Sequence, residues 1–298
     1  MKVVISGASG LIGSALVASL AADGHEVVRL VRRTPAAPDE ARWDPAGGTV
    51  DSAALRDCDA VVHLAGAGVG DHRWTPAYRQ EIRASRVDGT TTLATAVAQL
   101  DRPPQVFVSA SAIGVYGDTG SRTVDETAPA ADGFLPEVVQ AWEAAADPAR
   151  AAGIRTVHPR SGLVLSRHGG ALGRMLPIAR LGLLGPLGGG RQYWSYISRR
   201  DEVAALRFLI DTPGLAGPVN LTAPHPATNA EVTRALGALL RRPAVLPVPA
   251  FALRVVLGGF SDEVLGSRRV VPDRLERSGF QWSDGSLEQA LASGIGEN

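Results

Sequence analysis

The sequence predicts an α/β protein with a doubly wound parallel sheet of the Rossmann type and a smaller C-terminal lobe. Short apolar strands alternate with helical patterns through the first half of the chain, which is typical of a parallel sheet with crossover helices on both faces. A glycine loop separates the first strand from the first helix, and after residue 160 the pattern loosens into glycine-rich and proline-rich segments. We therefore expect a Rossmann domain over residues 1–220, with segments joining the second lobe from about residue 165, and a small C-terminal domain over 221–298.

The apolar patterns place the individual elements in order. Leu11, Leu16 and Leu20 recur at helical spacing after the glycine loop, and Gly24 suits the end of that helix. We expect strands at 2–6, 26–31, 60–64, 106–109, 156–159 and 219–221, and helices at 83–100 and 137–150. Farther on we expect a helix at 229–240 with Asn229 as its N-cap, an extended segment at 243–251 and a last helical pattern that ends near 291.

Composition excludes several classes of protein. The 30 Lys and Arg residues balance 30 Asp and Glu residues, so there is no basic excess to hold nucleic acid and no polybasic anchor for anionic lipid. Cys58 is the only cysteine, which excludes an intramolecular disulfide, and no apolar run is long enough to span a membrane. The six histidines lack the spacing of metal ligands. We expect a cytoplasmic protein without metal, nucleic-acid or membrane partners.

The glycine loop is the most informative motif. It reads Gly7-Ala8-Ser9-Gly10-Leu11-Ile12-Gly13, directly after a strand and at the start of a helix. In a dinucleotide-binding turn the first glycine permits the tight turn, the second lets the backbone approach a pyrophosphate, and the third lets helix and strand pack closely. The N-terminus of the helix then offers free N–H groups and a favourable dipole to the anion. The loop therefore predicts a bound dinucleotide, against the alternative of a plain tight turn.

The end of the second strand indicates which dinucleotide. Folds selective for NAD usually place Asp or Glu here to accept a hydrogen bond from the ribose 2′-hydroxyl, whereas this chain has Arg32 and Arg33. A guanidinium attracts a 2′-phosphate through charge-assisted hydrogen bonds. Arg32, assisted by Arg33, therefore favours NADP(H), although a solvated arginine pair at a strand end is the alternative.

Further motifs run along nearly the whole chain. They are GASGLIG from Gly7, VVHLAG from Val61, SASAIGVYG from Ser109, WEAAA from Trp142, RSGLVLS from Arg160 and VVPDRLERSGFQW near the end. In these motifs the chain resembles the extended short-chain dehydrogenase/reductase (SDR) superfamily. It is more closely similar to an atypical branch, the NAD(P)-dependent epimerase family with cell-division-inhibitor-like members. The last motif resembles the small C-terminal domain of unassigned role that marks this branch.

The resemblance implies a set of cofactor contacts at the matching positions. The glycine loop would face the pyrophosphate, Arg32 the 2′-phosphate, the end of the third strand the adenine and ribose, and Val164 the nicotinamide end. The candidate contacts are Gly7, Ser9, Gly10, Leu11, Ile12, Arg32, Arg33, Leu64, Ala65, Gly66, Glu81, Arg86, Ser109 and Val164. For Glu81 and Arg86, which are five residues apart on one helix, a simple surface pair is the alternative.

Catalytic residues are where the chain departs from the superfamily. Active members use Tyr-x-x-x-Lys with an upstream serine; the lysine lowers the pKa of the tyrosine, which transfers a proton alongside the hydride. Lys2 is the only lysine here, so the motif is absent in every register. The corresponding helix, around 135–143, carries Leu, Val and Trp instead. Ser111, which matches the superfamily's serine, and Tyr116, which would point toward the substrate pocket, remain as candidate catalytic residues, with packing and loop hydrogen bonds as the alternative.

Two acidic pairs lie near the expected pocket. We expect Asp201 and Glu202 to open a helix, where N-capping is their most plausible role. We expect Asp125 and Glu126 on a loop over the pocket, with a solvated face as the alternative.

Two functional hypotheses remain open. The first is an NADP(H)-binding oxidoreductase or isomerase of epimerase type with an altered proton-transfer apparatus, acting on a sugar nucleotide or a small carbonyl compound. The second is a non-catalytic NADP(H)-binding sensor or scaffold, which the missing lysine supports. The resemblance also implies a homodimer formed through the long helices expected at 83–100 and 137–150.

Overall fold

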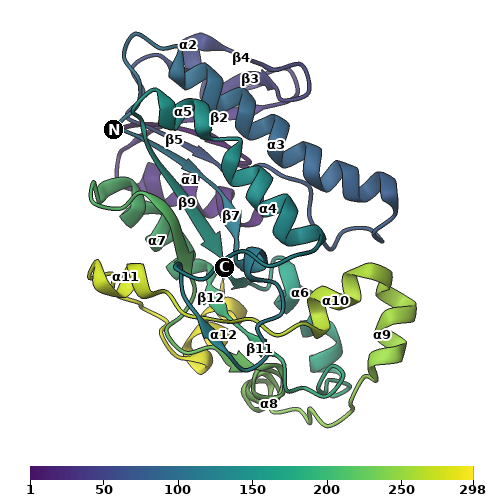
Figure 1. Cartoon of the computed structure of the whole chain (residues 1–298). Helices are drawn as coiled ribbons and strands as arrows, with labels where there is room; N and C mark the ends of the chain where they lie inside the picture. The colour runs from purple at the N-terminus through teal and green to yellow at the C-terminus, as the bar shows by residue number, and fades with distance from the viewer. Residues whose placement is uncertain (298) are drawn as a thin grey trace.

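A nine-stranded, mainly parallel sheet forms the centre of the computed structural model, which describes residues 1–297 (Figure 1). The strand order is β13-β9-β6-β5-β1-β2-β3-β4, with β7 paired to β9; only the β3–β4 pair is antiparallel. The strands are β1 (Lys2–Ser6), β2 (Glu26–Val31), β3 (Glu40–Asp44), β4 (Thr49–Val50), β5 (Ala60–His63), β6 (Val106–Ser109), β7 (Ser111–Ala112), β9 (Arg155–Ser161) and β13 (Gly217–Leu221). This is the predicted doubly wound sheet.

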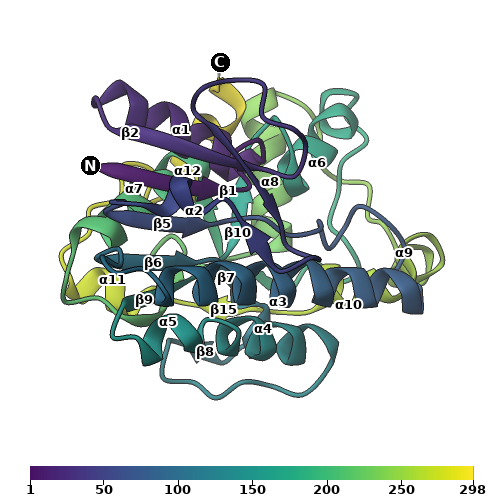
Figure 2. The same cartoon turned by 90° about the horizontal axis from the view of Figure 1, so that it is seen from above.

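Helices cover both faces of the sheet because its strands are apolar on both sides. On one face Val3 and Ile5 of β1 pack against the apolar stripes of α1 (Leu11–Ala22) and α7 (Arg199–Asp211). On the other face Val4 and Val61 pack against α3 (Pro76–Ala98) and α5 (Asp147–Ala151). Figure 2 shows α3, α5 and α4 (Phe134–Ala144) together along that face. All four of these strand side chains are fully buried.

The second lobe lies beyond the carboxyl ends of the strands (Figure 1). Its helices are α6 (Gly170–Arg180), α8 (Asn229–Leu240), α9 (Ala250–Leu257), α10 (Ser261–Leu265), α11 (Asp273–Arg277) and α12 (Leu287–Gly296). Three small sheets pair β10 (Leu163–Leu165) with β12 (Tyr196–Ser198), β11 (Tyr193–Trp194) with β14 (Ala227–Thr228), and β15 (Arg269–Val270) with β8 (Thr123–Val124). The short elements α2 (Ser52–Leu55), η1 (Ile113–Tyr116) and η2 (Gly258–Phe260) complete the chain. The lobe therefore borders the edge of the sheet where the glycine loop lies.

Several elements differ from the sequence-based expectation. The helix expected at 137–150 is broken into α4 and α5, because the chain turns at Ala145 and Ala146 and Pro148 starts a new first turn. The helix expected from residue 83 begins at Pro76, whose ring suits a first turn and whose preceding Thr75 caps the helix. The segment expected to stay extended to 251 becomes helical at Ala250. Strands β3 and β4, which widen the sheet, were not expected.

Two predicted caps are wrong. Thr228, not Asn229, caps α8, because its hydroxyl accepts from the N–H of Glu231 and the Glu231 carboxylate accepts from the N–H of Thr228. Asn229 instead accepts from the backbone N–H of Leu187 at 2.8 Å. Ser198 caps α7 by accepting from the N–H of Asp201, so Asp201 and Glu202 are not capping residues. In the first case the sequence offered two adjacent polar side chains, and tertiary packing decided between them; in the second case the cap lies three residues before the predicted acidic pair.

The turn between β1 and α1 is the tightest packing contact of the sheet. Gly7 has a φ of +72°, a backbone conformation that other residues rarely adopt. A Cβ at Gly13 would lie well inside the 3.0 Å that real Cβ atoms keep, against the carbonyl oxygen of Gly7. Helix α1 can therefore begin this close to β1 only if residue 13 has no side chain.

We predict that Gly13→Ala lowers the free energy of unfolding by about 1–3 kcal/mol, the usual cost of forcing one extra carbon into a packed site. The neighbour is rigid backbone, so the contact cannot be relieved by a change of rotamer. Urea unfolding followed by far-UV circular dichroism measures the difference.

The matched control is Gly214→Ala, because a Cβ at Gly214 meets nothing within 4 Å and its φ is not positive. The control should change stability by less than about 0.5 kcal/mol or increase it slightly. Equal stabilities for the two variants would show that the turn tolerates a side chain at residue 13.

Candidate functional site

The glycine loop has the geometry of an anion cradle. Gly10 is the N-cap of α1 and has no side chain to satisfy the first turn of the helix. The N–H groups of Leu11 and Ile12 find no acceptor among residues 1–297, and Ser9 and Gly10 are exposed. Unsatisfied N–H groups at an open helix N-terminus bind phosphate well. The residues present therefore fit the pyrophosphate of a dinucleotide.

Arg32 lies at the end of β2, beside the strand that carries the glycine loop. It is exposed, and no carboxylate of the described chain lies within ion-pair distance of it, whereas its neighbours are paired. Arg33 makes two hydrogen bonds to Glu40, at 2.6 and 2.8 Å. Of the two arginines predicted to meet a 2′-phosphate, Arg32 is free to do so and Arg33 is held by a carboxylate.

The end of β5 forms the next wall of the site. Gly7 lies so close to Leu64 and Ala65 that a Cβ at Gly7 would collide with their backbone. Arg86, on α3, donates to the carbonyl oxygen of Ala67 at 2.9 Å, and its Cγ would be 3.4 Å from a Cβ at Gly66. Burial lowers the pKa of Arg86 to about 10. Arg86 therefore supports the loop after β5 through its hydrogen bond to Ala67, and its side chain borders the site at Gly66.

The other predicted contacts are more scattered. Glu81 is exposed, and no ion pair joins it to Arg86 in residues 1–297. Ser109 is buried at the end of β6, and its hydroxyl has no partner in that part of the chain. Val164 lies close to the glycine loop through the first residues of α6: Gly170 would place a Cβ 3.4 Å from the Val164 carbonyl oxygen and 4.0 Å from Leu11.

Ser111 belongs to a buried polar network that the sequence did not reveal. Its hydroxyl donates to Glu143 of α4 at 2.5 Å, and Glu143 accepts two further hydrogen bonds from Arg160 of β9, at 2.8 and 2.9 Å. Burial alone would raise the pKa of the Glu143 carboxyl, but the hydrogen bonds and charge of Arg160 outweigh it and lower that pKa. Glu143 is therefore a carboxylate that orients the Ser111 hydroxyl.

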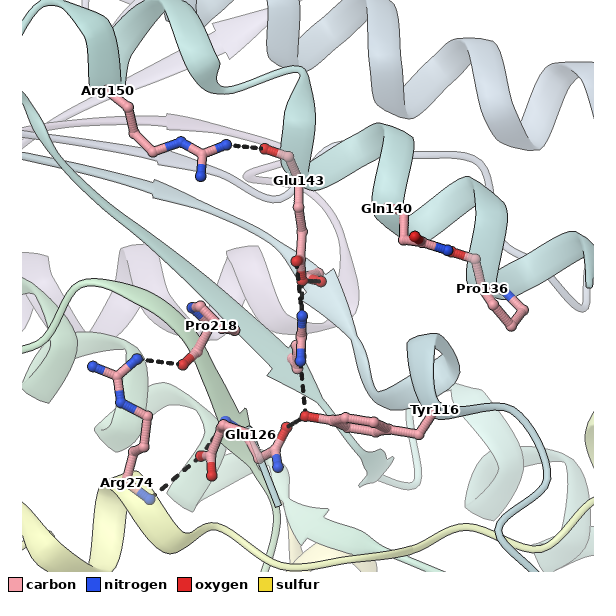
Figure 3. Close-up of polar contacts among 11 residues, drawn as sticks. Tyr116, Glu126, Pro136, Gln140, Glu143, Arg150, Pro218 and Arg274 are labelled. Atoms are coloured by element: carbon pink, nitrogen blue, oxygen red, sulfur yellow. Dashed lines mark hydrogen bonds and ion pairs between the residues drawn. The ribbon is translucent and has the colours of Figure 1, made fainter. Parts of the chain in front are cut away.

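Tyr116 lies at the other end of this network. Figure 3 shows Glu143 reaching from α4 and Tyr116 reaching from η1 toward the same point. The Tyr116 hydroxyl accepts from Arg160 at 2.9 Å and donates to the side-chain oxygen of Asn220 at 2.8 Å. Burial raises the pKa of Tyr116 in spite of Arg160, and the residue is 3% exposed. The hydroxyl thus points into a satisfied buried network, whereas we expected it to point toward the substrate pocket.

Within the helix expected to carry the superfamily's tyrosine and lysine, Leu135 and Val139 face apolar surroundings. Val139 belongs to an apolar cluster with Ile113 and Val115, and Leu135 lies within van der Waals distance of Gly114. Glu143, one turn after Val139 on the same helix, is the residue of α4 that reaches the serine. The WEAAA and RSGLVLS motifs contain Glu143 and Arg160, but only the fold brings the two together.

Glu126 is half-buried, and its carboxylate makes tertiary hydrogen bonds. Its carboxylate accepts from the backbone N–H of Asn220 at 2.8 Å and of Arg274 at 3.4 Å (Figure 3). Burial raises the pKa of Glu126. The acidic loop at 125–126 therefore ties the last strand of the sheet to the C-terminal segment.

Asp201 and Glu202 make tertiary contacts in place of the expected cap. Asp201 accepts from the backbone N–H groups of Ser283 and Asp284, both at 2.9 Å. Glu202 accepts from the Ser161 hydroxyl at 2.5 Å, at the end of β9, and its second oxygen is buried without a partner in residues 1–297. Burial raises the pKa of Glu202 to about 7. A protonatable carboxyl therefore lies buried at the carboxyl edge of the sheet.

Two kinds of site are absent from residues 1–297. No group of three or more His, Cys, Asp and Glu side chains is arranged to hold a metal ion. No helix in that range is long and apolar enough to cross a membrane.

The parallel sheet, the glycine loop and the free arginine at the end of β2 together define a Rossmann protein of the extended SDR type. The sequence profile of the NAD dependent epimerase/dehydratase family matches residues 3–221, and that of a domain of unknown function, DUF1731, matches residues 248–293. The chain belongs to the NAD dependent epimerase/dehydratase family.

Its relatives span several kingdoms. An epimerase family protein of Mycobacterium leprae is 46% identical, and the alignment covers 97% of this chain and 94% of the relative. The human epimerase family protein SDR39U1 is 37% identical, with 98% of each chain covered. The sequence-based resemblance to the epimerase branch with a small C-terminal domain is confirmed.

Solved structures support the same fold. The crystal structure of human SDR39U1 (isoform 2) with NADPH has a TM-score of 0.90 at 35% identity and covers both chains completely. The nucleoside-diphosphate sugar epimerase of Corynebacterium glutamicum has a TM-score of 0.82 at 34% identity, over 99% of this chain and 58% of that chain. UDP-glucose 4-epimerase of Thermus thermophilus with NAD, at 22% identity and a TM-score of 0.76, shares the fold.

We predict that Glu202→Gln removes a pH-dependent loss of stability. A carboxyl whose pKa is higher in the folded chain than in the unfolded chain stabilises the fold fully below its unfolded pKa. That stabilisation is lost as the pH rises through the folded pKa, which is about 7 for Glu202. The difference in unfolding free energy between wild type and Glu202→Gln should change by about 3 kcal/mol between a pH below the unfolded pKa of the carboxyl and pH 8. The change favours the variant at the higher pH.

Urea unfolding over this pH range measures the difference, with Glu137→Gln on the exposed face of α4 as the matched control. The control should run parallel to wild type at every pH. A Glu202→Gln curve that also runs parallel to wild type would mean that Glu202 titrates as an ordinary solvated carboxyl.

Proposed function

We propose that the protein binds NADP(H) and uses it for oxidoreductase or isomerase chemistry of the epimerase type on a small carbonyl or sugar-nucleotide substrate. The observation that carries the proposal is the pairing of an open anion cradle at Gly10 with Arg32, an exposed arginine without a carboxylate partner in residues 1–297. NADPH is the ligand of the human SDR39U1 crystal structure, which supports the same choice for this chain.

Each part of the cofactor has a candidate partner. The N–H groups of Leu11 and Ile12 would hold the pyrophosphate, and Arg32 the 2′-phosphate. Gly66 would border the adenosine ribose, and Val164 would lie at the nicotinamide end. When bound, the cofactor supplies or accepts a hydride.

Ser111 is the residue that we propose to orient the substrate. Its proton is directed at Glu143, so its oxygen is left to accept a hydrogen bond from a substrate hydroxyl. Arg160 keeps Glu143 ionised, and Tyr116 accepts a hydrogen bond from a third N–H group of Arg160. Tyr116 is in this view a positioning residue, because its hydroxyl acts only through Arg160.

A second candidate function is a cofactor-binding sensor or scaffold without turnover. The specific observation in its favour is the apolar cluster around Val139, which replaces the expected ionisable pair with aliphatic packing. A carboxylate with a lowered pKa such as Glu143 is a weak proton donor at neutral pH. Tight NADPH binding without turnover of any carbonyl compound or nucleotide sugar would favour this alternative.

We predict that Arg32→Asp weakens NADPH binding by about 10- to 100-fold and leaves NADH binding within about threefold of wild type. The physical reason is the loss of charge-assisted hydrogen bonds to a group that only NADPH carries. Fluorescence titration of both cofactors gives the two dissociation constants.

Arg33→Ala is the matched control, because Arg33 is occupied by Glu40. It should change the NADPH constant by less than about threefold. Equal losses of NADPH and NADH binding in Arg32→Asp would contradict the 2′-phosphate assignment.

If an assay of carbonyl compounds and nucleotide sugars with NADP(H) detects turnover, we predict that Ser111→Ala lowers kcat by at least about 100-fold without a change in NADPH affinity. Tyr116→Phe should lower kcat by less than about tenfold, since Arg160 keeps its bidentate contact with Glu143. Steady-state kinetics with saturating cofactor separates the two. A Tyr116→Phe loss as large as that of Ser111→Ala would make Tyr116 a direct participant.

A further inference from the structure

Exposed large apolar side chains are concentrated in one part of the molecule. Apart from Met1, every such side chain of the described residues lies at 178–183 or 239–256. At the end of α6, Leu181 is 74% exposed, and in the segment before α9, Val245 is 72% exposed. Scattered exposed apolar residues are normal, but a concentration of them marks an interaction surface.

The two segments lie side by side. The N–H of Leu246 donates to the carbonyl oxygen of Leu184 at 3.2 Å, and the N–H of Val248 to that of Pro186 at 2.9 Å. Gly182 lies against the ring of Pro243. The exposed side chains at the end of α6 and those before α9 therefore belong to one surface.

Helix α9 continues this surface. None of its residues is buried, and Phe251, Val255 and Val256 are 68–70% exposed. In Figure 1 α9 lies at the edge of the second lobe, away from the main sheet, and Figure 2 also shows it at the outer end of the molecule. Leu253 and Leu257 are half-buried, but no residue of α9 is fully buried, so most of its apolar face lacks the packing partner that normally stabilises a helix.

Every charged residue in these segments is an arginine. Residues 170–190 contain Arg174 and Arg180, and residues 232–260 contain Arg234, Arg241, Arg242 and Arg254, with no Asp or Glu in either range. Of these six, only Arg174 forms an ion pair within residues 1–297, with Asp71. The apolar surface therefore has a rim of unpaired positive charge.

A hollow of about 500 Å³ lies within this surface. It is lined by Pro186, Ala230, Thr233, Ala238, Ala244 and Val245, together with Arg234 and Arg242. Small apolar walls with two guanidinium groups suit an anionic headgroup attached to an apolar tail.

We propose that this apolar and basic face, formed by the end of α6, the part of α8 after Glu231, residues 241–249 and α9, is a docking surface for an anionic lipid bilayer. The arginines meet the lipid phosphates, and the side chains of α9 and of residues 245–246 enter the headgroup boundary. The protein would lie on the membrane, as interfacial amphipathic helices do. The proposal does not depend on the proposed cofactor chemistry.

The charge distribution argues against the other occupants. A two-fold contact with a second copy would place the arginine rim against itself, which is repulsive. The exposed apolar side chains of α9, beside unpaired arginines, suit the boundary between lipid headgroups and acyl chains.

The balanced net charge of the chain led us to expect no lipid anchor. That expectation averages over the whole molecule, but charge acts on a membrane only within about a Debye length, roughly 8 Å at physiological salt. Six arginines without an acid in two adjacent segments act locally, whatever the acids on the Rossmann domain contribute elsewhere.

The test is flotation of the full-length protein with vesicles of phosphatidylcholine alone or phosphatidylcholine with phosphatidylglycerol. We expect binding to the vesicles that contain phosphatidylglycerol only, and weaker binding as salt increases. Arg241→Glu/Arg242→Glu should weaken binding by about 25-fold or more, since each arginine near a lipid surface contributes about fivefold.

The matched control is Arg56→Glu/Arg83→Glu, an equal charge change at two exposed arginines of the Rossmann domain, which should bind like wild type. Val255→Ser/Val256→Ser, at side chains too exposed to support the fold, should also lose binding without a change in charge. Thermal unfolding checks that each variant is folded.

The proposal is overturned if vesicles of phosphatidylcholine alone bind the protein as well as those with phosphatidylglycerol. It is also overturned if Arg241→Glu/Arg242→Glu and Arg56→Glu/Arg83→Glu lose binding to the same extent. Absence of binding to both vesicles overturns it as well. Light scattering then identifies the occupant. A dimer that Val255→Ser/Val256→Ser breaks would assign the face to a second copy of the chain, whereas a monomeric protein would leave an acidic protein as the remaining candidate partner for the face.

Discussion

The close contact between Gly13 and the carbonyl of Gly7 sets the position of α1 against β1, and much of the site depends on it. With no Cβ at residue 13, the helix begins directly above the strand, and its first N–H groups point over the carboxyl edge of the sheet. Those groups have no acceptor in residues 1–297, so the fold maintains an unsatisfied anion-binding terminus. The same turn presses Gly7 against the end of β5 and thereby joins two walls of the site.

The buried pair of Glu143 and Arg160 is the second constraint. Removing two charges from water costs several kcal/mol per ion, and the cost is offset only when geometry is good and the remaining donors and acceptors are satisfied. Here the pair is bidentate, Ser111 and Tyr116 fill further positions, and Asn220 closes the chain of hydrogen bonds. The network ties β7, β9, β13, α4 and η1 together, so the serine of the site is held by a structure that also stabilises the edge of the sheet.

Charge is distributed unevenly over the second lobe. Five arginines without an ion-pair partner in residues 1–297 lie in the segments that carry its exposed aliphatic side chains, whereas Arg268 and Arg277 of the same lobe are paired with acids. Balanced totals therefore conceal a surface with a strong local field. The two lobes present different surfaces: one carries the exposed glycine loop at the N-terminus of α1, and the other carries the exposed apolar side chains of α9.

Local sequence was enough to determine most of the parallel strands, the glycine turn and the end of β2, because each depends on residues close together in the chain. It predicted β1, β2 and β6 with their observed bounds and marked Arg32 as a candidate phosphate ligand. Only tertiary structure decided which of two adjacent polar residues caps a helix, that Arg33 is occupied by Glu40, and that Glu143 and Arg160 meet across 17 residues. It also brought residues 178–183 and 239–256 onto one face. The reason is physical: periodicity reports which side of an element is apolar, whereas pairing of buried charges and exposure of a surface depend on what the rest of the chain packs against it.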